Sequence, residues 1–108
     1  MAIKANITID QGSDFSTEIS VTDDNGDPVN LTGYSAAAQL RKHYTSSTFT
    51  AFVANVNVSG AVTLSMNAAT SSNVTPGRYV YDCELTSSSN VVSRLVEGIV
   101  TVTPQVTR

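Results

Sequence analysis

The chain has 108 residues, the size of a single domain with one hydrophobic core. Its 6 Lys and Arg residues against 9 Asp and Glu residues give a net charge of −3. This balance argues against nucleic-acid binding, because phosphate recognition needs clustered cations. Charged residues make up 14% of the chain and hydrophobic residues 41%, so a folded domain is expected rather than a disordered one.

The single cysteine, Cys83, excludes an internal disulfide and a cysteine-based metal cluster. It also fits a chain that folds in a reducing cytoplasm. Residues 1–10 contain no apolar signal-peptide core, and no stretch approaches the ~18 residues of a membrane span. We therefore expect synthesis in the cytoplasm and no membrane contact.

Hydrophobic side chains alternate with polar ones at a period of two through most of the chain, which predicts β-strands. In the first two-thirds of the chain the predicted strands cover residues 3–9, 15–21, 34–42, 52–58 and 62–66. The third of these contains three consecutive alanines, which indicates that another backbone packs closely over it; a helix is the alternative for this stretch.

The alternation stops over residues 67–77. Asn67 is suited to cap a single helical turn there, because its side chain can accept a hydrogen bond from the first turn. Pro76 and Gly77 then mark a tight turn.

Two more strands are predicted over residues 79–85 and 91–104, joined by a Ser-rich turn. Gly98 is predicted to form a β-bulge in the last strand, because the apolar phase slips around it. The result is about seven strands with turn signals every 8 to 12 residues, the spacing of an antiparallel β-sandwich. The predicted organisation is one all-β domain over residues 1–108.

The segment Val21–Tyr34 contains a cluster of acidic and amide side chains around one glycine, which is the strongest candidate of the chain for an ion-binding loop. A calcium loop of the EF-hand type that starts at Asp23 needs glycine at position 6 and a bidentate glutamate at position 12. Here the glycine, Gly26, falls at position 4, and position 12 is a tyrosine. Asn25 followed by Gly26 is instead a strong hairpin signal, because both residues tolerate positive φ. The segment is therefore predicted to be a turn and no metal site.

No catalytic residue, cofactor site or metal site is predicted elsewhere. His43 is the only histidine, so a His-dependent triad or a multi-His metal site has too few members, and a solvated loop position is expected. The serines lack the G-x-S-x-G elbow that exposes a nucleophile. Cys83 shares an apolar strand face with Tyr79, Tyr81 and Leu85, which favours a buried, space-filling thiol over a nucleophile.

Asp82 and Glu84 lie on the outward face of one predicted strand. Glycosidase carboxylates flank a cleft and need different environments, which two neighbours on an exposed strand do not have. Pairing of Glu84 with Arg94 on the next strand is the alternative role. We therefore expect no enzymatic activity and no small-molecule substrate. Four Asn-x-Ser/Thr sequons are attributed to chance in a Ser- and Thr-rich chain, namely those at Asn6, Asn30, Asn57 and Asn73.

The order of these signals resembles a known class of proteins. The chain opens with ITIDQGSDFS, continues with VTDDNGDPVNLTGY and AAAQLRK, and closes with PGRYVYDCELTSSSN and RLVEGIVTVTPQVTR. This succession is similar to small β-sandwich proteins encoded among the virion genes of tailed bacteriophages, including those that infect cyanobacteria. It is similar, more distantly, to the N-terminal domain of phage baseplate upper proteins, in which a dG-x-P-x-dLtG segment follows the second strand. The resemblance extends from Ile7 to Arg108.

The resemblance implies an immunoglobulin-like sandwich in a virion, made in the host cytoplasm, without catalytic residues. The expected function is a structural component of a tailed phage particle, associated with the tail or baseplate in multiple copies. Its partners would be other virion proteins and copies of itself. The polar first strand, expected at a sheet edge, and the final TPQVTR segment are the predicted docking elements.

Two other functions fit the same sequence. The first is a capsid decoration protein of the same fold, which the sequence does not separate from a tail component. The second is a carbohydrate-binding adhesin domain, in which an exposed aromatic ring stacks on a sugar. The chain has no Trp, and Tyr44 and Phe49 in the least regular loop are the candidates for such a ring.

Overall fold

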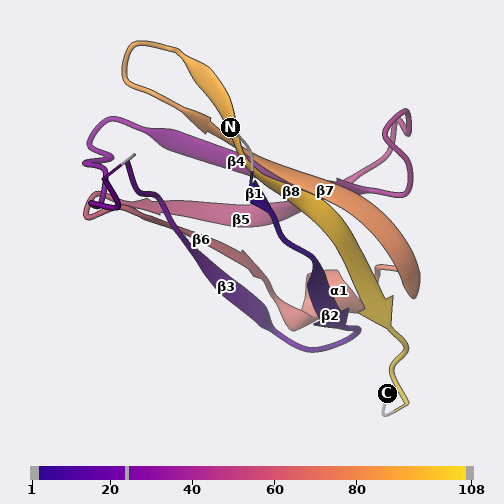
Figure 1. Cartoon of the computed structure of the whole chain (residues 1–108). Coiled ribbons are helices and arrows are strands. Elements are labelled where there is room, and N and C mark those ends of the chain that lie inside the picture. Colours follow the sequence, from indigo (N-terminus) through magenta and orange to yellow (C-terminus); the bar gives the residue numbers. More distant parts are fainter. Residues whose placement is uncertain (1–2, 24, 107–108) are drawn as a thin grey trace.

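A computed structural model describes residues 3–23 and 25–106 of the chain (Figure 1). The described residues form eight strands and one short helix. In chain order these are β1 Ile3–Lys4, β2 Ile7–Asp10, β3 Phe15–Ser20, β4 Ser35–Arg41, β5 Thr50–Asn57, β6 Ala61–Met66, α1 Ala68–Ser72, β7 Gly77–Thr86 and β8 Val92–Thr103. The prediction of an all-β fold is confirmed, and the three-alanine stretch is strand β4 rather than a helix.

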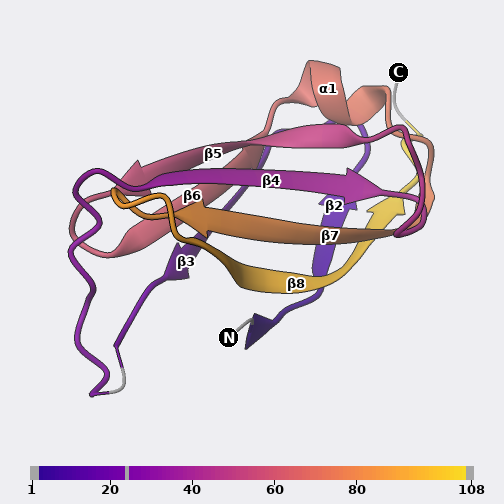
Figure 2. The same cartoon turned by 90° about the horizontal axis from the view of Figure 1, so that it is seen from above.

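The strands form one continuous curved sheet in the order β1-β8-β7-β4-β5-β6-β3, and β2 pairs beside β1 on β8. Strand β5 joins the two halves of this sheet. Its first residues pair with β4, where Phe52 is opposite Ala38, and its later residues pair with β6, where Val56 is opposite Val62. Seen from above, β4, β7 and β8 lie nearest the viewer, and β3 and β6 lie behind them (Figure 2). The sheet is therefore nearly closed into a barrel.

The first strand differs from its prediction in two ways. It is interrupted at Ala5 and Asn6, so residues 3–10 form two strands instead of one. Both run parallel to β8, where Ile3 is opposite Val96 and Ile7 is opposite Val100. The sheet is therefore mixed, and the prediction of purely antiparallel pairing is wrong. All other strand pairs are antiparallel among the described residues.

The β-bulge predicted at Gly98 lies elsewhere. Gly98 pairs regularly with Tyr81, whereas the β7–β8 register slips between Cys83 and Glu84, which leaves Leu95 as the extra residue. Gly98 has a different role: a Cβ atom there would lie 2.1 Å from the carbonyl oxygen of Ala5. The missing side chain lets the segment between β1 and β2, which runs beside β8, approach this strand closely.

The core follows the predicted alternation on most strands. Apolar side chains that point inward from β2, β4, β5, β6, β7 and β8 form one cluster. Its fully buried members include Ile9, Leu31, Leu40, Val62, Leu64, Cys83, Val96 and Val100. Burial of this single cluster is the main source of stability, at about 25 cal/mol for each Å² of apolar surface removed from water.

Helix α1 is the single helical turn that Asn67 was expected to cap. Asn67 Oδ1 accepts a hydrogen bond of 2.8 Å from the main-chain N–H of Thr70, which confirms this prediction. The helix packs against the turn between β2 and β3. Ser71 there is fully buried: its Oγ accepts from the N–H of Gly12 at 3.0 Å and donates to the carbonyl oxygen of Ser13 at 2.8 Å.

Candidate functional site

The segment Val21–Tyr34 is a turn, as predicted. The N–H of Gly26 donates to the carbonyl oxygen of Asp23 at 3.0 Å, and Gly26 has a φ of +83°. The Asp23 carboxylate accepts from the main-chain N–H groups of Asn25 and Asp27 at 2.9 and 3.0 Å. One carboxylate oxygen is thus occupied by donors of its own turn, which is the usual role of Asp in an Asx-turn.

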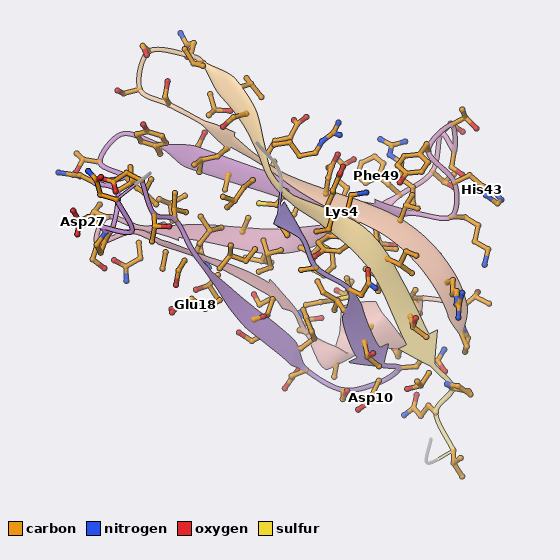
Figure 3. All side chains as sticks on the ribbon, in the orientation of Figure 1. Lys4, Asp10, Glu18, Asp27, His43 and Phe49 are labelled. Atoms are coloured by element: carbon orange, nitrogen blue, oxygen red, sulfur yellow. The ribbon has the colours of Figure 1, made fainter. Side chains whose placement is uncertain are left out.

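His43 lies in the exposed loop of residues 42–49 between β4 and β5, as expected (Figure 3). Its main-chain N–H donates to Ser46 Oγ at 3.0 Å, and its carbonyl oxygen accepts from the Ser46 N–H at 3.0 Å. The Arg41 guanidinium donates to the Ser46 carbonyl oxygen and lies 5.0 Å from the ring centroid of Phe49. These contacts fold the loop back onto the end of β4.

Cys83 is fully buried on β7, opposite Val96 of β8. Burial, followed by the negative charges of Asp82 and Glu84, raises the pKa of its thiol to about 11. The thiol is therefore protonated at neutral pH, and the thiolate that acts as a nucleophile is not formed. The location agrees with the prediction of a space-filling side chain.

The outer face of β4, β7 and β8 brings polar side chains into rows across the three strands. Gln39 of β4 is opposite Asp82 of β7, which is opposite Glu97 of β8. In the next row, Arg41 is opposite Val80. The row of Gln39, Asp82 and Glu97 sets an amide beside two carboxylates on one surface.

Arg94 of β8 neutralises part of this surface. Its Nε lies 3.4 Å from Asp82 Oδ2, and its Nη1 donates to Glu97 Oε1 at 3.1 Å. Glu84 is the main-chain partner of Arg94, as the sequence suggested, but the ion pairs go to Asp82 and Glu97. The bulge at Leu95 accounts for this, because it places Arg94 and Glu97 on the same side of β8 although they are three residues apart.

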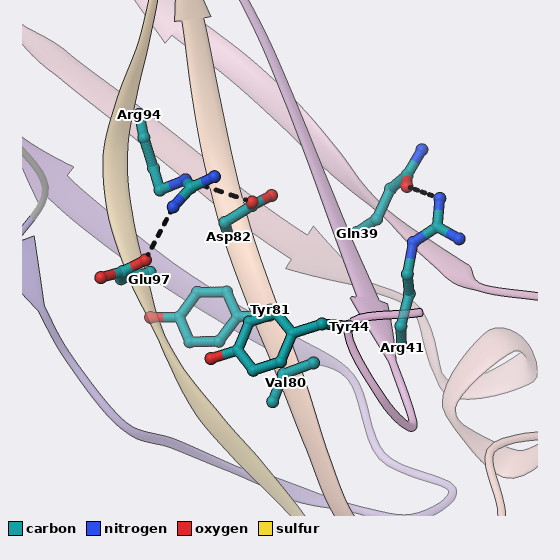
Figure 4. A pocket seen from close by; sticks show the side chains of 8 residues that line it. All are labelled: Gln39, Arg41, Tyr44, Val80, Tyr81, Asp82, Arg94 and Glu97. Carbon is teal, nitrogen blue, oxygen red and sulfur yellow. Dashed lines mark hydrogen bonds and ion pairs between the residues drawn. The ribbon is translucent and has the colours of Figure 1, made fainter. Parts of the chain in front are cut away.

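These side chains line a pocket of about 210 Å³ on the outer face (Figure 4). Arg94, Asp82 and Glu97 stand on one side of it, and Gln39 with Arg41 on the other; Gln39 Oε1 accepts from Arg41 Nη2 at 3.0 Å. The remaining lining residues are Tyr44, Val80 and Tyr81.

The two aromatic candidates of the 42–49 loop have different surroundings. Tyr44 lines this pocket, and its side chain is 82% exposed. Phe49 instead lies against Arg41 and lines a separate, more open depression beside α1. The structure therefore brings Tyr44, but not Phe49, to the polar rows. The sequence did not reveal this pocket, because the register between strands decides which residues become neighbours. The bulge at Leu95 also shifts the β7–β8 register by one residue.

A second candidate surface is the seam between the two edges of the sheet. On one side, β1 and β2 pair only with β8, and on the other β3 pairs only with β6, among the described residues. Between them lies a groove of about 250 Å³. It is lined by Ala5, Asn6, Ile7, Thr17, Glu18, Ile19, Tyr81 and Val96. The predicted position of the first strand at a sheet edge is confirmed.

The asparagines of the four sequons take part in local hydrogen bonds or in helix capping. Asn30 Oδ1 accepts from both the N–H and the hydroxyl of Thr32, at 3.0 and 2.6 Å. Asn57 and Ser59 repeat this arrangement at 2.9 and 2.6 Å. Asn6 Oδ1 accepts from the N–H of Ile99 at 3.1 Å. The fourth asparagine, at position 73, ends α1.

No family model and no curated protein matches the chain. Among solved structures, a family 123 glycoside hydrolase from Clostridium perfringens is similar to 95% of this chain, with 14% sequence identity and a TM-score of 0.45. The matched part is 23% of the hydrolase, so this chain spans about a quarter of that protein. A likeness of this size assigns neither a family nor an activity.

In the part of the chain that the structure describes, no helix is long and apolar enough to cross a membrane. The same residues contain no group of three or more His, Cys, Asp or Glu side chains that could hold a metal ion.

Proposed function

We propose that this protein is a non-enzymatic structural component of a tailed phage particle, a docking module of the tail or baseplate present in multiple copies. Its partners are other virion proteins and copies of itself. The proposal starts from the resemblance of the sequence to small virion β-sandwich proteins. The observation that supports it best is the open seam between the two edges of the sheet.

Main-chain groups line both sides of this seam. The N–H of Val21 donates to Gly60, in continuation of the β3–β6 ladder. The main-chain N–H and C=O groups of successive residues point alternately to the two neighbouring strand positions. Those of Ser16, Glu18 and Ser20 therefore face away from β6. On the other side of the seam, the main-chain N–H of Ala5 donates to β8. By the same alternation, the main-chain N–H and C=O groups of Thr8 on β2 face away from β8. In the described residues no main-chain hydrogen bond joins β2 to β3.

The seam suits an extended segment of a neighbouring subunit. Ile7, Ile19 and Val96 give its floor an apolar character, and the edges offer main-chain donors and acceptors. A strand added to such an edge gains affinity from main-chain hydrogen bonds and specificity from side chains in the groove. The exposed charges of Lys4 and Glu18 at the edges oppose indiscriminate pairing, as charges on edge strands commonly do (Figure 3).

Weak contacts of this kind are sufficient to hold a subunit in a virus particle. In a symmetric array, many linked contacts raise the effective concentration of each one. The TPQVTR segment adds a second contact surface; its Val106 is 91% exposed, and its last two residues lie outside the described part.

We further propose that the curved sheet belongs to the immunoglobulin-like class. Two features support this assignment: β2 lies parallel to the last strand at one edge, and β3 pairs with β6 on the opposite side. A short helix between β6 and β7 is compatible with the connection between two sheet halves in such folds. A crystal structure with a different strand order would contradict this assignment.

The test is incorporation into particles. Mass spectrometry of purified virions is expected to find the chain, and a reconstruction is expected to place it on the tail or baseplate. Density on the head would favour the capsid decoration role instead, and absence from virions would overturn the proposal. In a complementation assay, Glu18→Lys at the seam is expected to reduce incorporation. Glu84→Lys, a charge reversal at an exposed position of central strand β7, is the matched control and is expected to incorporate normally.

A further inference from the structure

The pocket on the outer face of β4, β7 and β8 contains hydrogen-bond donors and acceptors that have no partner among the described residues. Gln39 uses its oxygen on Arg41, and its side-chain N–H groups have no partner among the described residues. Asp82 and Glu97 each engage Arg94 through one oxygen, so the second carboxylate oxygen of each remains available. The internal pairs use part of the hydrogen-bonding capacity of these groups, and the remaining donors and acceptors are available to a ligand.

Tyr44 adds a large exposed ring to this polar surface. Its side chain is 82% exposed and stands at the border of the pocket beside Val80 (Figure 4). An aromatic ring with a polar tip binds well to a ligand that has one apolar and one polar face. The combination of an apolar surface and a few fixed polar groups is typical of small-molecule sites.

The charges of the pocket restrict the ligand. The two arginines and two carboxylates that line the pocket leave it without net charge. Arg94 pairs with Asp82 and Glu97. Arg41 donates to the neutral oxygens of Gln39 and Ser46. An anionic ligand therefore gains no net attraction from these four charges and meets two carboxylates. A purely apolar ligand would cover the carboxylates without replacing their hydrogen bonds to water, which is costly. A neutral ligand with many hydroxyl groups meets neither obstacle.

We propose that this pocket binds a neutral pyranose unit of a glycan. The ring of Tyr44 stacks against the apolar C–H face of the sugar. Asp82 and Glu97 accept hydrogen bonds from its hydroxyl groups, and the Gln39 amide donates to a hydroxyl oxygen. This site lies on a different surface from the docking seam: the seam lies between β2 and β3, whereas the pocket is on the outer face of β4, β7 and β8, and Tyr81 is the one residue that lines both.

The experiment is a titration of the ¹⁵N-labelled chain with neutral monosaccharides, namely glucose, galactose, mannose and N-acetylglucosamine, followed by amide chemical shifts. With at least one of these sugars we expect saturable shifts in the millimolar range at residues of the pocket and of the 42–49 loop. Tyr44→Ala is expected to weaken binding at least about tenfold, which corresponds to about 1.4 kcal/mol. Asp82→Asn is expected to weaken it as well.

Tyr44→Phe retains the ring and is expected to keep most of the affinity. Val53→Ala, which removes an exposed apolar side chain from β5 outside the pocket, is the control and should bind like the original chain. The absence of shifts with all four sugars would overturn the proposal, as would equal affinity of Tyr44→Ala. Tighter binding of the anionic N-acetylneuraminic acid would contradict the assignment of a neutral ligand. Failure of virion incorporation leaves these results unchanged, so the two proposals are tested separately.

Discussion

The phenol oxygen of Tyr81 donates a hydrogen bond of 2.6 Å to the carbonyl oxygen of Ala5. This bond ties central strand β7 to the short segment between β1 and β2, which runs beside β8. Ala5 also donates its N–H to the carbonyl oxygen of Glu97 at 2.9 Å. Together the two bonds hold one edge of the seam in place.

Tyr81→Phe is expected to lower the free energy of unfolding by about 1 kcal/mol, because it removes one hydrogen bond and keeps the ring in the core. Urea denaturation followed by circular dichroism measures this. Tyr44→Phe is the matched control: its hydroxyl has no hydrogen-bond partner among the described residues, and it should unfold like the original chain. Equal effects of the two substitutions would show that the bond to Ala5 does not stabilise the fold.

Gly98→Ala is expected to destabilise the domain by about 1 to 3 kcal/mol, the usual cost of overpacking. The added Cβ would lie 2.1 Å from the Ala5 carbonyl oxygen and 2.8 Å from its carbon, so the segment between β1 and β2 must move. Faster amide hydrogen exchange at Ala5 and in β2 would report that displacement. Ser93→Ala, an exposed position on the same strand, is the control. An unchanged exchange rate at Ala5 would contradict the close-approach role of Gly98.

The sequence predicted the strands well and their partners poorly, for a physical reason. Alternation of side chains records which face of a strand is buried, and it is the same for a parallel and an antiparallel neighbour. The pairing of Ile7 with Val100 therefore could not be inferred, whereas the cap at Asn67 could, because its partner is three residues away. Gly98 was assigned to a bulge because the apolar phase slips around it, but the extra residue is Leu95. The glycine serves a close approach of another backbone instead, the other common role of glycine in a strand.

The candidate site depended even more on register. Gln39, Asp82 and Glu97 come from three strands and become neighbours only when both registers are known. Tyr44 was identified from the sequence as an exposed ring, but nothing local indicates which polar side chains surround it. A single-residue slip of β8 would have placed Glu97 on the opposite face.

Ser71→Ala is expected to cost about 1 to 3 kcal/mol, although the change in volume is small. Its buried hydroxyl satisfies the N–H of Gly12 and the carbonyl oxygen of Ser13, and the substitution leaves the N–H without that partner. Ser72→Ala, an exposed neighbour on the same helix, is the matched control. Thermal unfolding of both variants measures the difference, and similar midpoints would contradict the role of Ser71 in fixing the β2–β3 turn.

Asp23→Ala is expected to lower stability by about 1 kcal/mol, because the carboxylate accepts two main-chain hydrogen bonds in its turn. Asp23→Asn keeps an acceptor oxygen and should lose less. Calcium is expected to change neither the unfolding midpoint of the original chain nor that of the variants. A calcium-dependent increase in the midpoint that disappears in Asp23→Ala would show that the turn binds the ion.

The buried thiol of Cys83 predicts a loss of stability at alkaline pH. Burial, with a smaller effect of the Asp82 and Glu84 charges, raises its pKa from 9.0 to about 11. Below about pH 8 the thiol is almost fully protonated in both states, so this group does not change the free energy of unfolding with pH. Between pH 9 and 11 the unfolded chain releases the proton and the folded chain retains it, so the free energy of unfolding falls by up to about 3 kcal/mol.

Urea denaturation of the original chain and of Cys83→Ala at a series of pH values tests this. The variant is expected to be less stable at neutral pH, because it leaves a cavity, but to lose less stability between pH 9 and 11. Burial also raises the pKa of Tyr81, so part of the decline above pH 10 should persist in the variant. Below pH 9 a thiol-specific reagent is expected to modify Cys83 only after unfolding. Parallel pH profiles of the two chains, or rapid modification of the folded protein, would show that the thiol is accessible to water.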